Sequence, residues 1–497
     1  MKEILYKSTR STEGTLTASQ AILKGLADDG GLFVPLEIPK LDVTVEELSK
    51  MTYQQVAYEV MKLYFTDFTE AELKNCIEKA YDSKFDTEEI APLAEVEGAY
   101  YLELFHGATI AFKDMALSIL PHLLTTSAKK NNVKNKIVIL TATSGDTGKA
   151  ALAGFADVPG TRIAVFYPKN GVSPIQEKQM VTEKGANTFV AGITGNFDDA
   201  QTGVKKMFSD KELAAYLDEK GFQFSSANSI NIGRLVPQMV YYVYAYTRLV
   251  KAGTIEAGDM INVVVPTGNF GNILAAYYAS LMGLPVRKFI CASNDNKVLF
   301  DFFTTGKYDR NRDFILTTSP SMDILISSNF ERLIYLSCGC DSEKNKSFMS
   351  DLKEKGAYTV TEDMKKFIDE SFIGGFASED MVGKRIKNVF DKTGYVLDTH
   401  TAVASAVYEN YLDSTKDDTT SVIVSTASPY KFTRAVLSSI DGIKHDEDDF
   451  VLVDKLNELS GIEIPKAVND IRNAPVLHNT VCDKEDMKKE VENFLTL

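Results

Sequence analysis

The chain has 497 residues, of which 44% are hydrophobic and 25% charged, and its formal net charge is −15. This composition is typical of a globular protein with a large core and excludes disordered, collagen-like and coiled-coil chains. At roughly 150 residues per domain, the length predicts about three domains. Since the chain is acidic and its basic residues are scattered, we expect no nucleic acid among its partners.

The sequence predicts no membrane span and no secretion signal. The start, MKEILYKSTR, lacks a long apolar region, and Pro237, Gln238 and Arg248 interrupt the most apolar long stretch, 235–250. Five scattered cysteines are typical of free thiols in a reducing compartment, so we expect a cytoplasmic protein. Neither the cysteines nor the five histidines show zinc-ligand spacing, and we expect no metal.

The first hundred residues are expected to be mainly helical after an opening strand. Apolar residues recur at three- and four-residue spacing over 45–64 and 69–81, which predicts helices. Before them, DDGGLFVP at 28–35 is a turn-rich segment that runs into an extended one.

The rest of the chain alternates short apolar runs with helical patterns. Strands are expected at 137–140, 163–167, 188–191, 261–265, 288–292 and 421–425. Helices are expected at 149–156, 174–184, 198–208 and 273–282. Strands without polar alternation, separated by helices, indicate buried parallel strands, so the fold class is α/β. The less regular segment 300–390 is interpreted as a helix-rich elaboration.

Two glycine-rich turns each stand between a strand and a helix: TSGDTG at 143–148 and PTGNFGN at 266–272. Neither is a P-loop or a dinucleotide fingerprint. Unpaired amides and the helix dipole make such a turn suitable for an anion, although a glycine turn alone is more often only a turn. Two of them favour two anionic groups, or one large anionic ligand, at the carboxyl ends of the strands.

A lysine stands in the segment HGATIAFKD at 106–114. Lys113 is either a surface residue that opens a helix over 115–124, or a desolvated amine whose lowered pKa suits Schiff-base chemistry. Pyridoxal phosphate chemistry needs such a lysine, a phosphate cup, a loop for a carboxylate and a partner for the pyridine nitrogen. The chain offers Lys113, the two glycine loops and the hydroxyls of STASP at 425–429.

This set of motifs resembles the tryptophan-synthase-β-like pyridoxal phosphate enzymes of fold type II, and more closely the threonine synthases. DDGGLFVP resembles an N-terminal signature of that family, and HGATIAFKD its lysine motif, with Ala108 in place of the usual proline. GNFGN at 268–272 and SSANSINIGR at 225–234 resemble its phosphate-binding segments. The matches extend from about residue 6 to 432.

The resemblance implies two open parallel-rich sheets flanked by helices, plus a mainly helical N-terminal domain over 1–95. A large cofactor-binding lobe would comprise 96–130 and 231–497, including the 300–390 insertion, and a small lobe would comprise 131–230. The cofactor implied is pyridoxal 5′-phosphate.

The resemblance also implies residue roles. Lys113 would hold the cofactor and act as general base, and Thr426, or else Ser428, would face the pyridine nitrogen. Asp146 would face the cofactor 3′-oxygen, where an acid needs a proton or a nearby cation. The cofactor phosphate would bind Gly268, Asn269, Phe270, Gly271 and Asn272. The substrate carboxylate would bind Ser144, Gly145, Thr147 and Gly148, and the substrate phosphate Asn228, Ser229 and Arg234.

The reaction implied is the conversion of O-phospho-L-homoserine and water into L-threonine and phosphate, by a monomer or homodimer. A threonine or serine dehydratase, a phospho-lyase and a non-catalytic homologue remain alternatives. No role is expected for His106, Lys149 is expected to point to solvent more often than into a site, and Asp398 is expected to cap a helix.

Overall fold

A five-stranded parallel sheet organises the middle of the chain, in the order β15-β7-β6-β5-β8. The computed structural model describes residues 2–12, 14–143 and 145–496. In chain order, the first four strands of this sheet are β5 (Lys136–Ala142), β6 (Thr161–Pro168), β7 (Thr188–Thr194) and β8 (Phe222–Ser225). The helices between them are α7 (Asp146–Phe155), α8 (Pro174–Val181), α9 (Phe197–Ser209) and α10 (Lys211–Glu219). The parallel strands predicted for this region are confirmed.

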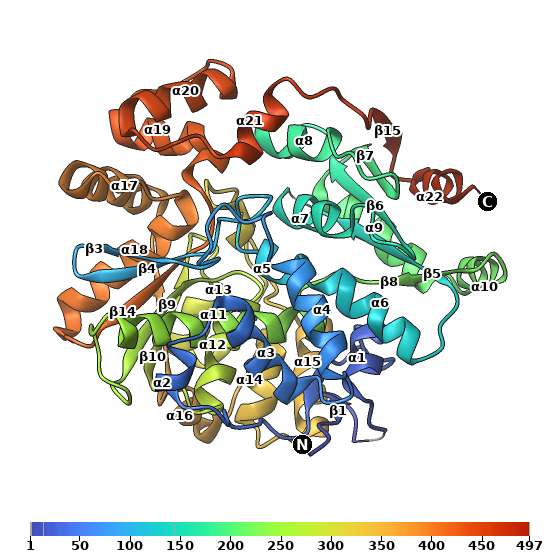
Figure 1. Cartoon of the computed structure of the whole chain (residues 1–497), viewed down its shortest axis with the longest axis horizontal. Coiled ribbons are helices and arrows are strands. Elements are labelled where there is room, and N and C mark those ends of the chain that lie inside the picture. Colours follow the sequence, from blue (N-terminus) through green and yellow to red (C-terminus); the bar gives the residue numbers. More distant parts are fainter. Residues whose placement is uncertain (1, 13, 144, 497) are drawn as a thin grey trace.

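A six-stranded sheet forms the larger lobe, in the order β13-β10-β9-β14-β4-β3 (Figure 1). Its strands are β3 (Leu93–Val96), β4 (Ala99–Glu103), β9 (Ile261–Pro266), β10 (Val286–Ser293), β13 (Phe372–Phe376) and β14 (Ser421–Ser425). All neighbours are parallel except β3, which pairs with β4 in the antiparallel direction.

Alternate residues of β9 show how helices cover both faces of this sheet. Val263 and Val265 pack in the same apolar cluster as α11 (Ile232–Lys251) and α12 (Gly271–Leu281). Val264, between them, packs with α17 (Glu379–Thr393) and α18 (Thr399–Thr415). Because both faces are buried, Val263, Val264 and Val265 are all apolar, which is why the sequence of the strand shows no alternation.

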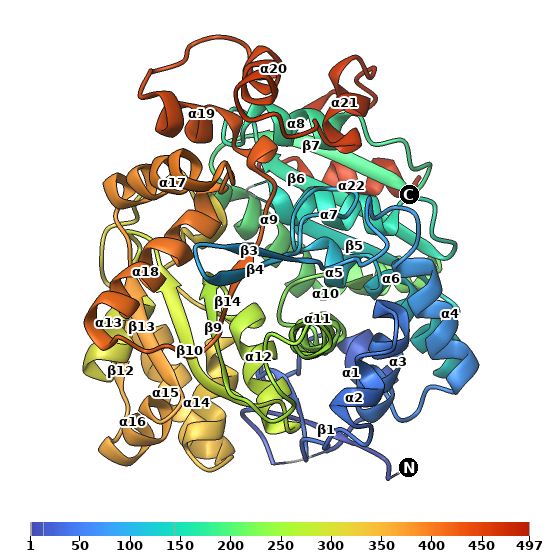
Figure 2. The same cartoon turned by 60° about the vertical axis from the view of Figure 1, so that its left-hand side comes forward.

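The N-terminal region is helical, as expected, but one expected helix is two. The region 45–64 forms α2 (Val45–Leu48) and α3 (Tyr53–Tyr64), because Thr52 caps a new helix start with its side chain. Helices α1 (Ala18–Lys24) and α4 (Glu70–Ala80) complete the region, and β1 (Tyr6–Ser8) pairs with β2 (Phe33–Pro35). Figure 2 shows these helices grouped beside α11.

The region 300–390 is more than an elaboration, because it supplies the edge strand β13 of the large sheet. Its other elements are the hairpin of β11 (Lys307–Asp309) and β12 (Ala357–Thr359), the turn η1 (Pro320–Met322), and helices α13 (Val298–Thr305), α14 (Phe330–Ser337), α15 (Ser342–Glu354) and α16 (Glu362–Asp369). The strand escapes prediction because Gly374 and Gly375 interrupt its apolar run.

The last residues leave the large lobe and return to the small one. After η2 (Pro429–Lys431), α19 (Thr433–Asp441), α20 (Asp449–Ser460) and α21 (Lys466–Arg472), strand β15 (Thr480–Asp483) pairs in parallel with β7, and α22 (Met487–Leu495) packs against α9. The expected boundaries assign all of 231–497 to the large lobe, whereas β15 and α22 join the small one. An apolar helix face in a sequence does not reveal which sheet it covers.

Two further observations concern the whole described chain. None of its helices combines the length and the apolar character that a bilayer crossing requires. The five cysteines are all free thiols.

The core of the small lobe is testable at Ile139, which is fully buried in β5, between β6 and β8. We expect Ile139→Ala to lower the free energy of unfolding by about 2–5 kcal/mol, because the truncated side chain leaves a cavity. Urea denaturation followed by circular dichroism measures the change. Ile443→Ala, at a position 58% exposed, is the control and should shift the midpoint little. Equal shifts for the two variants would contradict the packing described here.

Candidate functional site

The loop that follows β4 carries Lys113 into the interior between the two lobes. The Phe112 amide donates to the Thr426 carbonyl at 2.8 Å, and Ala111 forms a bridge with Ala427, so the loop is pinned to the end of β14. Helix α5 (Asp114–Leu117) begins directly after the lysine, followed by α6 (Leu120–Lys130). Only 9% of Lys113 is exposed. The structure therefore favours the desolvated amine over the surface lysine.

The environment of Lys113 favours its neutral form. Burial lowers the pKa of its amine to about 8; Asp146 opposes this shift, and the cations Lys431 and Arg234 add to it. The amine donates a hydrogen bond to Ser321 Oγ at 3.1 Å and lies 3.7 Å from Asp146 Oδ2. A buried amine with a lowered pKa is what nucleophilic or general-base chemistry needs.

Asp146, the first residue of α7, is buried among hydrogen-bond donors. Its Oδ1 lies 3.1 Å from Lys431 Nζ and accepts from Gln176 Nε2 at 2.8 Å. Its Oδ2 accepts from the Ser321 hydroxyl at 3.0 Å. Burial alone would raise the pKa of this carboxyl, but Lys431 and Lys113 hold it well below its usual range. An acid at this position is expected to need a proton or a nearby cation, and Lys431 is such a cation.

Sequence reasoning missed three residues of this cluster: Ser321, Lys431 and Gln176. Lys431 stands two residues after STASP, a signal that could have been used. Ser321 lies in η1, within the irregular region, and its amide donates to His400 Nε2 at 3.1 Å. No local pattern identifies a serine brought to the site from so distant a segment.

The loop at 143–148 uses some of its own amides. Thr143 Oγ1 accepts from the amides of Gly145 and Gly148, each at 2.9 Å. Gly145 has a φ of +134°, and a Cβ there would lie 2.4 Å from the Gln176 side chain, so only glycine fits. Thr147 is in the first turn of α7, whereas Ser144 lies outside the described residues. The expected carboxylate site stays a prediction.

The loop at 266–272 leads into α12 and is shaped by close contacts. A Cβ on Gly268 would lie 2.5 Å from the Ser321 carbonyl, and Phe270 adopts a left-handed φ of +63° at the start of the helix. The side-chain Oδ1 of Asn272 accepts from the Tyr241 and Tyr242 hydroxyls, while its buried Nδ2 has no partner among the described residues. The first turn of α12 is therefore held rigidly, as an anion site at a helix start requires.

Arg234, in the first turn of α11, is a buried cation without an acidic partner among the described residues. It is 3% exposed; its Nη1 donates to the Ala227 carbonyl at 2.8 Å, and its Nε has no partner there. Burial lowers its pKa to about 10. A buried guanidinium that no carboxylate neutralises is costly, and an anionic ligand would offset that cost.

Asn329 and Arg332 tie the two expected phosphate segments together. Asn329 Nδ2 donates to the Asn269 carbonyl at 3.1 Å and to the Ser229 carbonyl at 3.3 Å. Arg332, fully buried, donates to the Phe33 carbonyl at 2.8 Å and to the Ile230 carbonyl at 2.7 Å, and also bonds Asn329 Oδ1. The structure thus joins DDGGLFVP, SSANSINIGR and GNFGN, which lie far apart in the sequence. Asn228, by contrast, is exposed.

The two hydroxyls considered for the pyridine nitrogen differ in their surroundings. Ser428 Oγ accepts from the Tyr430 amide at 3.3 Å and so caps η2. Thr426 is buried, and its main chain is fixed from both sides: its amide donates to Thr401 Oγ1 at 3.2 Å and its carbonyl accepts from Phe112. Thr426 is therefore the better candidate of the two.

Three polar residues near the motifs have other partners. Lys149 pairs with Glu183 at 2.5 Å and is buried rather than pointing to solvent. Asp398 caps α18 as expected and also contacts His400 Nδ1 at 3.1 Å. His106 lies between Asp86, at 2.6 Å, and Glu103, at 3.0 Å. Within the described ranges, no group of acidic, histidine and cysteine side chains is placed to hold a metal.

Comparison with known proteins places these motifs in one family. The model of the threonine synthase N terminus matches residues 5–81, that of the pyridoxal-phosphate dependent enzymes 87–427, and that of the threonine synthase C-terminal region 401–481. Threonine synthase of Saccharomyces cerevisiae is 35% identical over 490 residues, which cover 92% of this chain and 94% of the yeast protein. Threonine synthase-like 1 of Homo sapiens is 37% identical, but this chain spans only 63% of its length.

Solved structures agree with the sequence relatives. The crystal structure of threonine synthase from yeast superposes with a TM-score of 0.88 at 32% identity and covers 99% of each chain. The structure of PLP-bound threonine synthase from Brucella melitensis gives a TM-score of 0.87 at 34% identity, covering 99% of this chain and 98% of the other. The fold type II architecture expected from the sequence is therefore confirmed.

The pH dependence of the unfolding free energy tests whether His106, in the lysine segment, is held as a cation. Burial alone would lower its pKa, but hydrogen bonds with Asp86 and Glu103 raise it to about 9. A raised pKa in the folded state adds stability below pH 6.5, and this stability is lost as the pH rises to 9. We expect wild type to exceed His106→Gln by about 2 kcal/mol in unfolding free energy at pH 6, and the difference to shrink towards pH 9.

The control for this experiment is His122→Gln. Burial lowers the pKa of His122 to about 4, so this histidine is neutral in both states above pH 6.5. Its replacement should leave the pH dependence between 6.5 and 9 unchanged. A constant difference between wild type and His106→Gln over that range would show that His106 is not held as a cation.

Proposed function

The chain belongs to the threonine synthase family, and from this premise we propose that it converts O-phospho-L-homoserine and water into L-threonine and phosphate, with pyridoxal phosphate as cofactor. It would thus be a carbon–oxygen lyase of amino-acid biosynthesis. The observation that carries the proposal is Arg234, a buried guanidinium that has no acidic partner among the described residues and is close enough to lower the pKa of the Lys113 amine. The family's substrate brings a phosphate as well as an amino acid, and this cation suits that phosphate.

The residues of the site fit the cofactor. Lys113 supplies a buried amine with a lowered pKa, which suits attachment to the cofactor aldehyde. The residues Gly268 to Asn272 bend tightly into the start of α12, where backbone amides and the helix dipole favour a phosphate. The Asn272 Nδ2, which has no partner among the described residues, is one more donor at this helix start.

Each residue then has a defined task. Pyridoxal phosphate, when bound, supplies an electron sink that acidifies protons on the substrate carbons. The Lys113 amine would remove and return protons at Cα and Cβ of the substrate. The Thr426 hydroxyl would be the partner of the pyridine nitrogen, and Asp146, whose charge is balanced by Lys431, would be the partner of the 3′-oxygen. Since a hydroxyl does not hold the ring protonated as a carboxylate would, the sink stays mild, which suits successive proton shifts before phosphate leaves.

The second anion site distinguishes this proposal from a threonine or serine dehydratase. A dehydratase substrate carries no phosphate, so a buried cation at Arg234 would remain unneutralised during its turnover. Arg234 instead presents a guanidinium fork, which matches phosphate oxygens. Ser229, held by Asn329, lies on the same segment and would add a hydroxyl donor.

The free cysteines are in keeping with a reducing compartment, and we propose that the protein acts in the cytoplasm.

The first test is turnover by the purified chain loaded with pyridoxal phosphate. We expect O-phospho-L-homoserine to yield threonine and inorganic phosphate in equal amounts, measured by amino-acid analysis and a phosphate assay. Lys113→Ala should lose the visible absorbance of lysine-bound cofactor and at least about a hundredfold in rate, since its general base is gone. Lys136→Ala, an exposed lysine at the start of β5, is the control. Formation of 2-oxobutanoate from threonine, without release of phosphate from phosphohomoserine, would instead indicate a dehydratase.

The second test concerns substrate affinity. We expect Arg234→Ala to raise the KM for O-phospho-L-homoserine by about 10–100-fold, because a charge-assisted hydrogen bond to phosphate is lost, while the cofactor absorbance is retained. Arg472→Ala, which breaks a surface pair with Asp454 on α20, should leave KM unchanged. An unchanged KM in Arg234→Ala would remove this arginine from the substrate site.

A further inference from the structure

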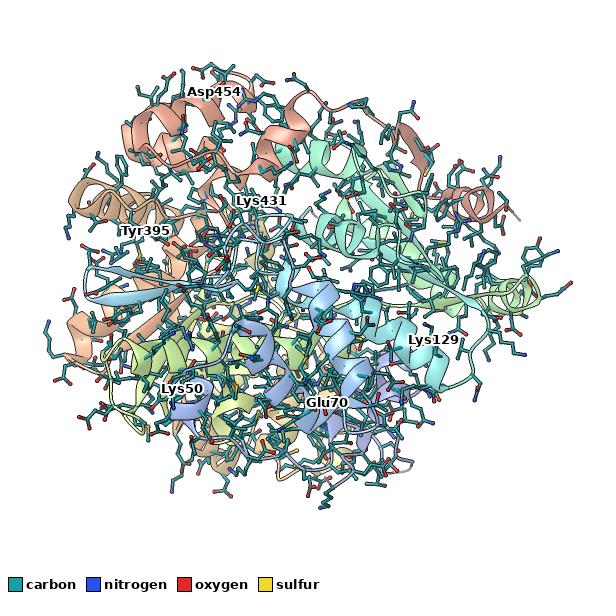
Figure 3. All side chains as sticks on the ribbon, in the orientation of Figure 1. Lys50, Glu70, Lys129, Tyr395, Lys431 and Asp454 are labelled. Carbon is teal, nitrogen blue, oxygen red and sulfur yellow. The ribbon has the colours of Figure 1, made fainter. Side chains whose placement is uncertain are left out.

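Two lysines share one carboxylate at the junction of the lobes. Lys431 Nζ lies 3.1 Å from Asp146 Oδ1, and Lys113 Nζ lies 3.7 Å from Asp146 Oδ2. Gln176 also donates to Oδ1 and the Ser321 hydroxyl to Oδ2, so each oxygen has its own set of donors. Figure 3 labels Lys431 near the middle of the molecule, and its side chain is fully buried.

The main chain around Lys431 fixes the position of its side chain. It ends η2, six residues after the last residue of β14, and its ammonium donates a second hydrogen bond to the Thr109 carbonyl at 2.8 Å. Thr109 belongs to the same segment as Lys113. A buried ammonium needs an anion close by, and Asp146 is the acid with which Lys431 forms an ion pair.

The balance between the Asp146 carboxylate and the lysines beside it decides the protonation of the Lys113 amine. Were Asp146 the counter-ion of Lys113 alone, its negative charge would favour the ammonium form of that lysine. An ammonium has no lone pair, so it can neither attack an aldehyde nor accept a proton from carbon. With Lys431 closer to the carboxylate than Lys113 is, the negative charge is already balanced.

We infer that Lys431 is a positioning residue for Lys113: its ammonium neutralises Asp146, so that the Lys113 amine is not held as an ion pair and stays available for reaction. The other titratable groups nearby are consistent with this. Arg234 on α11 acts on Lys113 in the same direction as Lys431, and His400 on α18 faces Asp146 while its Nε2 accepts from the Ser321 amide. Ser321 bridges Asp146 and Lys113 without adding charge. The importance of this arrangement for catalysis rests on the function proposed above, but the titration of Lys113 does not.

The test measures the titration of the Lys113 amine directly in the full-length chain freed of cofactor. Acetic anhydride acetylates neutral amines, so the extent of acetylation at Lys113, quantified by mass spectrometry across a pH series, reports the midpoint of its titration. We expect a midpoint near pH 8 in wild type. Lys431→Met should raise it by about one pH unit or more, because Asp146 then acts on Lys113 alone. Lys431→Arg should keep the wild-type midpoint.

Two further variants separate charge from packing. Asp146→Asn should lower the midpoint of Lys113, since only the cations Lys431 and Arg234 then remain beside it; this holds even if Lys431→Met does not fold. Lys149→Met removes another buried lysine, paired with Glu183, and should leave the midpoint unchanged. The inference is overturned if folded Lys431→Met titrates like wild type, if Lys431→Arg shifts as far as Lys431→Met, or if Asp146→Asn raises the midpoint.

This experiment is independent of the proposed function. Acetylation needs neither cofactor nor turnover. A chain that shows the expected shifts but makes no threonine would support the role of Lys431 and contradict the proposed reaction. If the chain makes threonine but Lys431→Met leaves the Lys113 midpoint unshifted, the proposed reaction is supported and the role of Lys431 is contradicted.

Discussion

A single buried carboxylate, that of Asp146, holds the site together. Its partners come from both lobes: Gln176 from the small lobe, and Lys431, Ser321 and Lys113 from the large one. A charge in such an environment is tolerated only when donors surround it, so the two lobes must meet in one geometry for the cluster to form. The Gly145 backbone allows this approach, because any side chain there would displace Gln176.

The site gathers cations in a chain whose net charge is −15. An acidic surface repels a dianionic substrate at long range, but salt screens that repulsion with a Debye length of about 8 Å. The proposed binding would therefore depend on local groups: Arg234, which has no acidic partner among the described residues, the helix start at Gly271 and the loop amides. Burial makes each of these groups more effective, because little water competes for the ligand.

The N-terminal region has a structural reason to accompany this site. Arg332 reaches from α14 to the Phe33 carbonyl in β2 and to the Ile230 carbonyl before α11, while Asn329 holds Asn269 and Ser229. The separation of the two proposed phosphate sites is thus set by buried hydrogen bonds that include the DDGGLFVP strand. Arg10 and Glu331 add a salt bridge at 2.7 Å between the same parts of the chain.

The sequence by itself determined the α/β class and most strands of the two sheets, and its motifs predicted Lys113, Asp146, Gly268–Asn272 and Arg234 as site positions. It did so because buried parallel strands are apolar at every position and because glycine turns before helices are local patterns. Only the tertiary structure decided that β13 and β15 belong to the sheets, and that Ser321, Gln176 and Lys431 surround Asp146. These residues come from segments up to 285 positions away from Asp146 along the chain. Long-range contacts of this kind depend on how the lobes pack, and no local spacing encodes them.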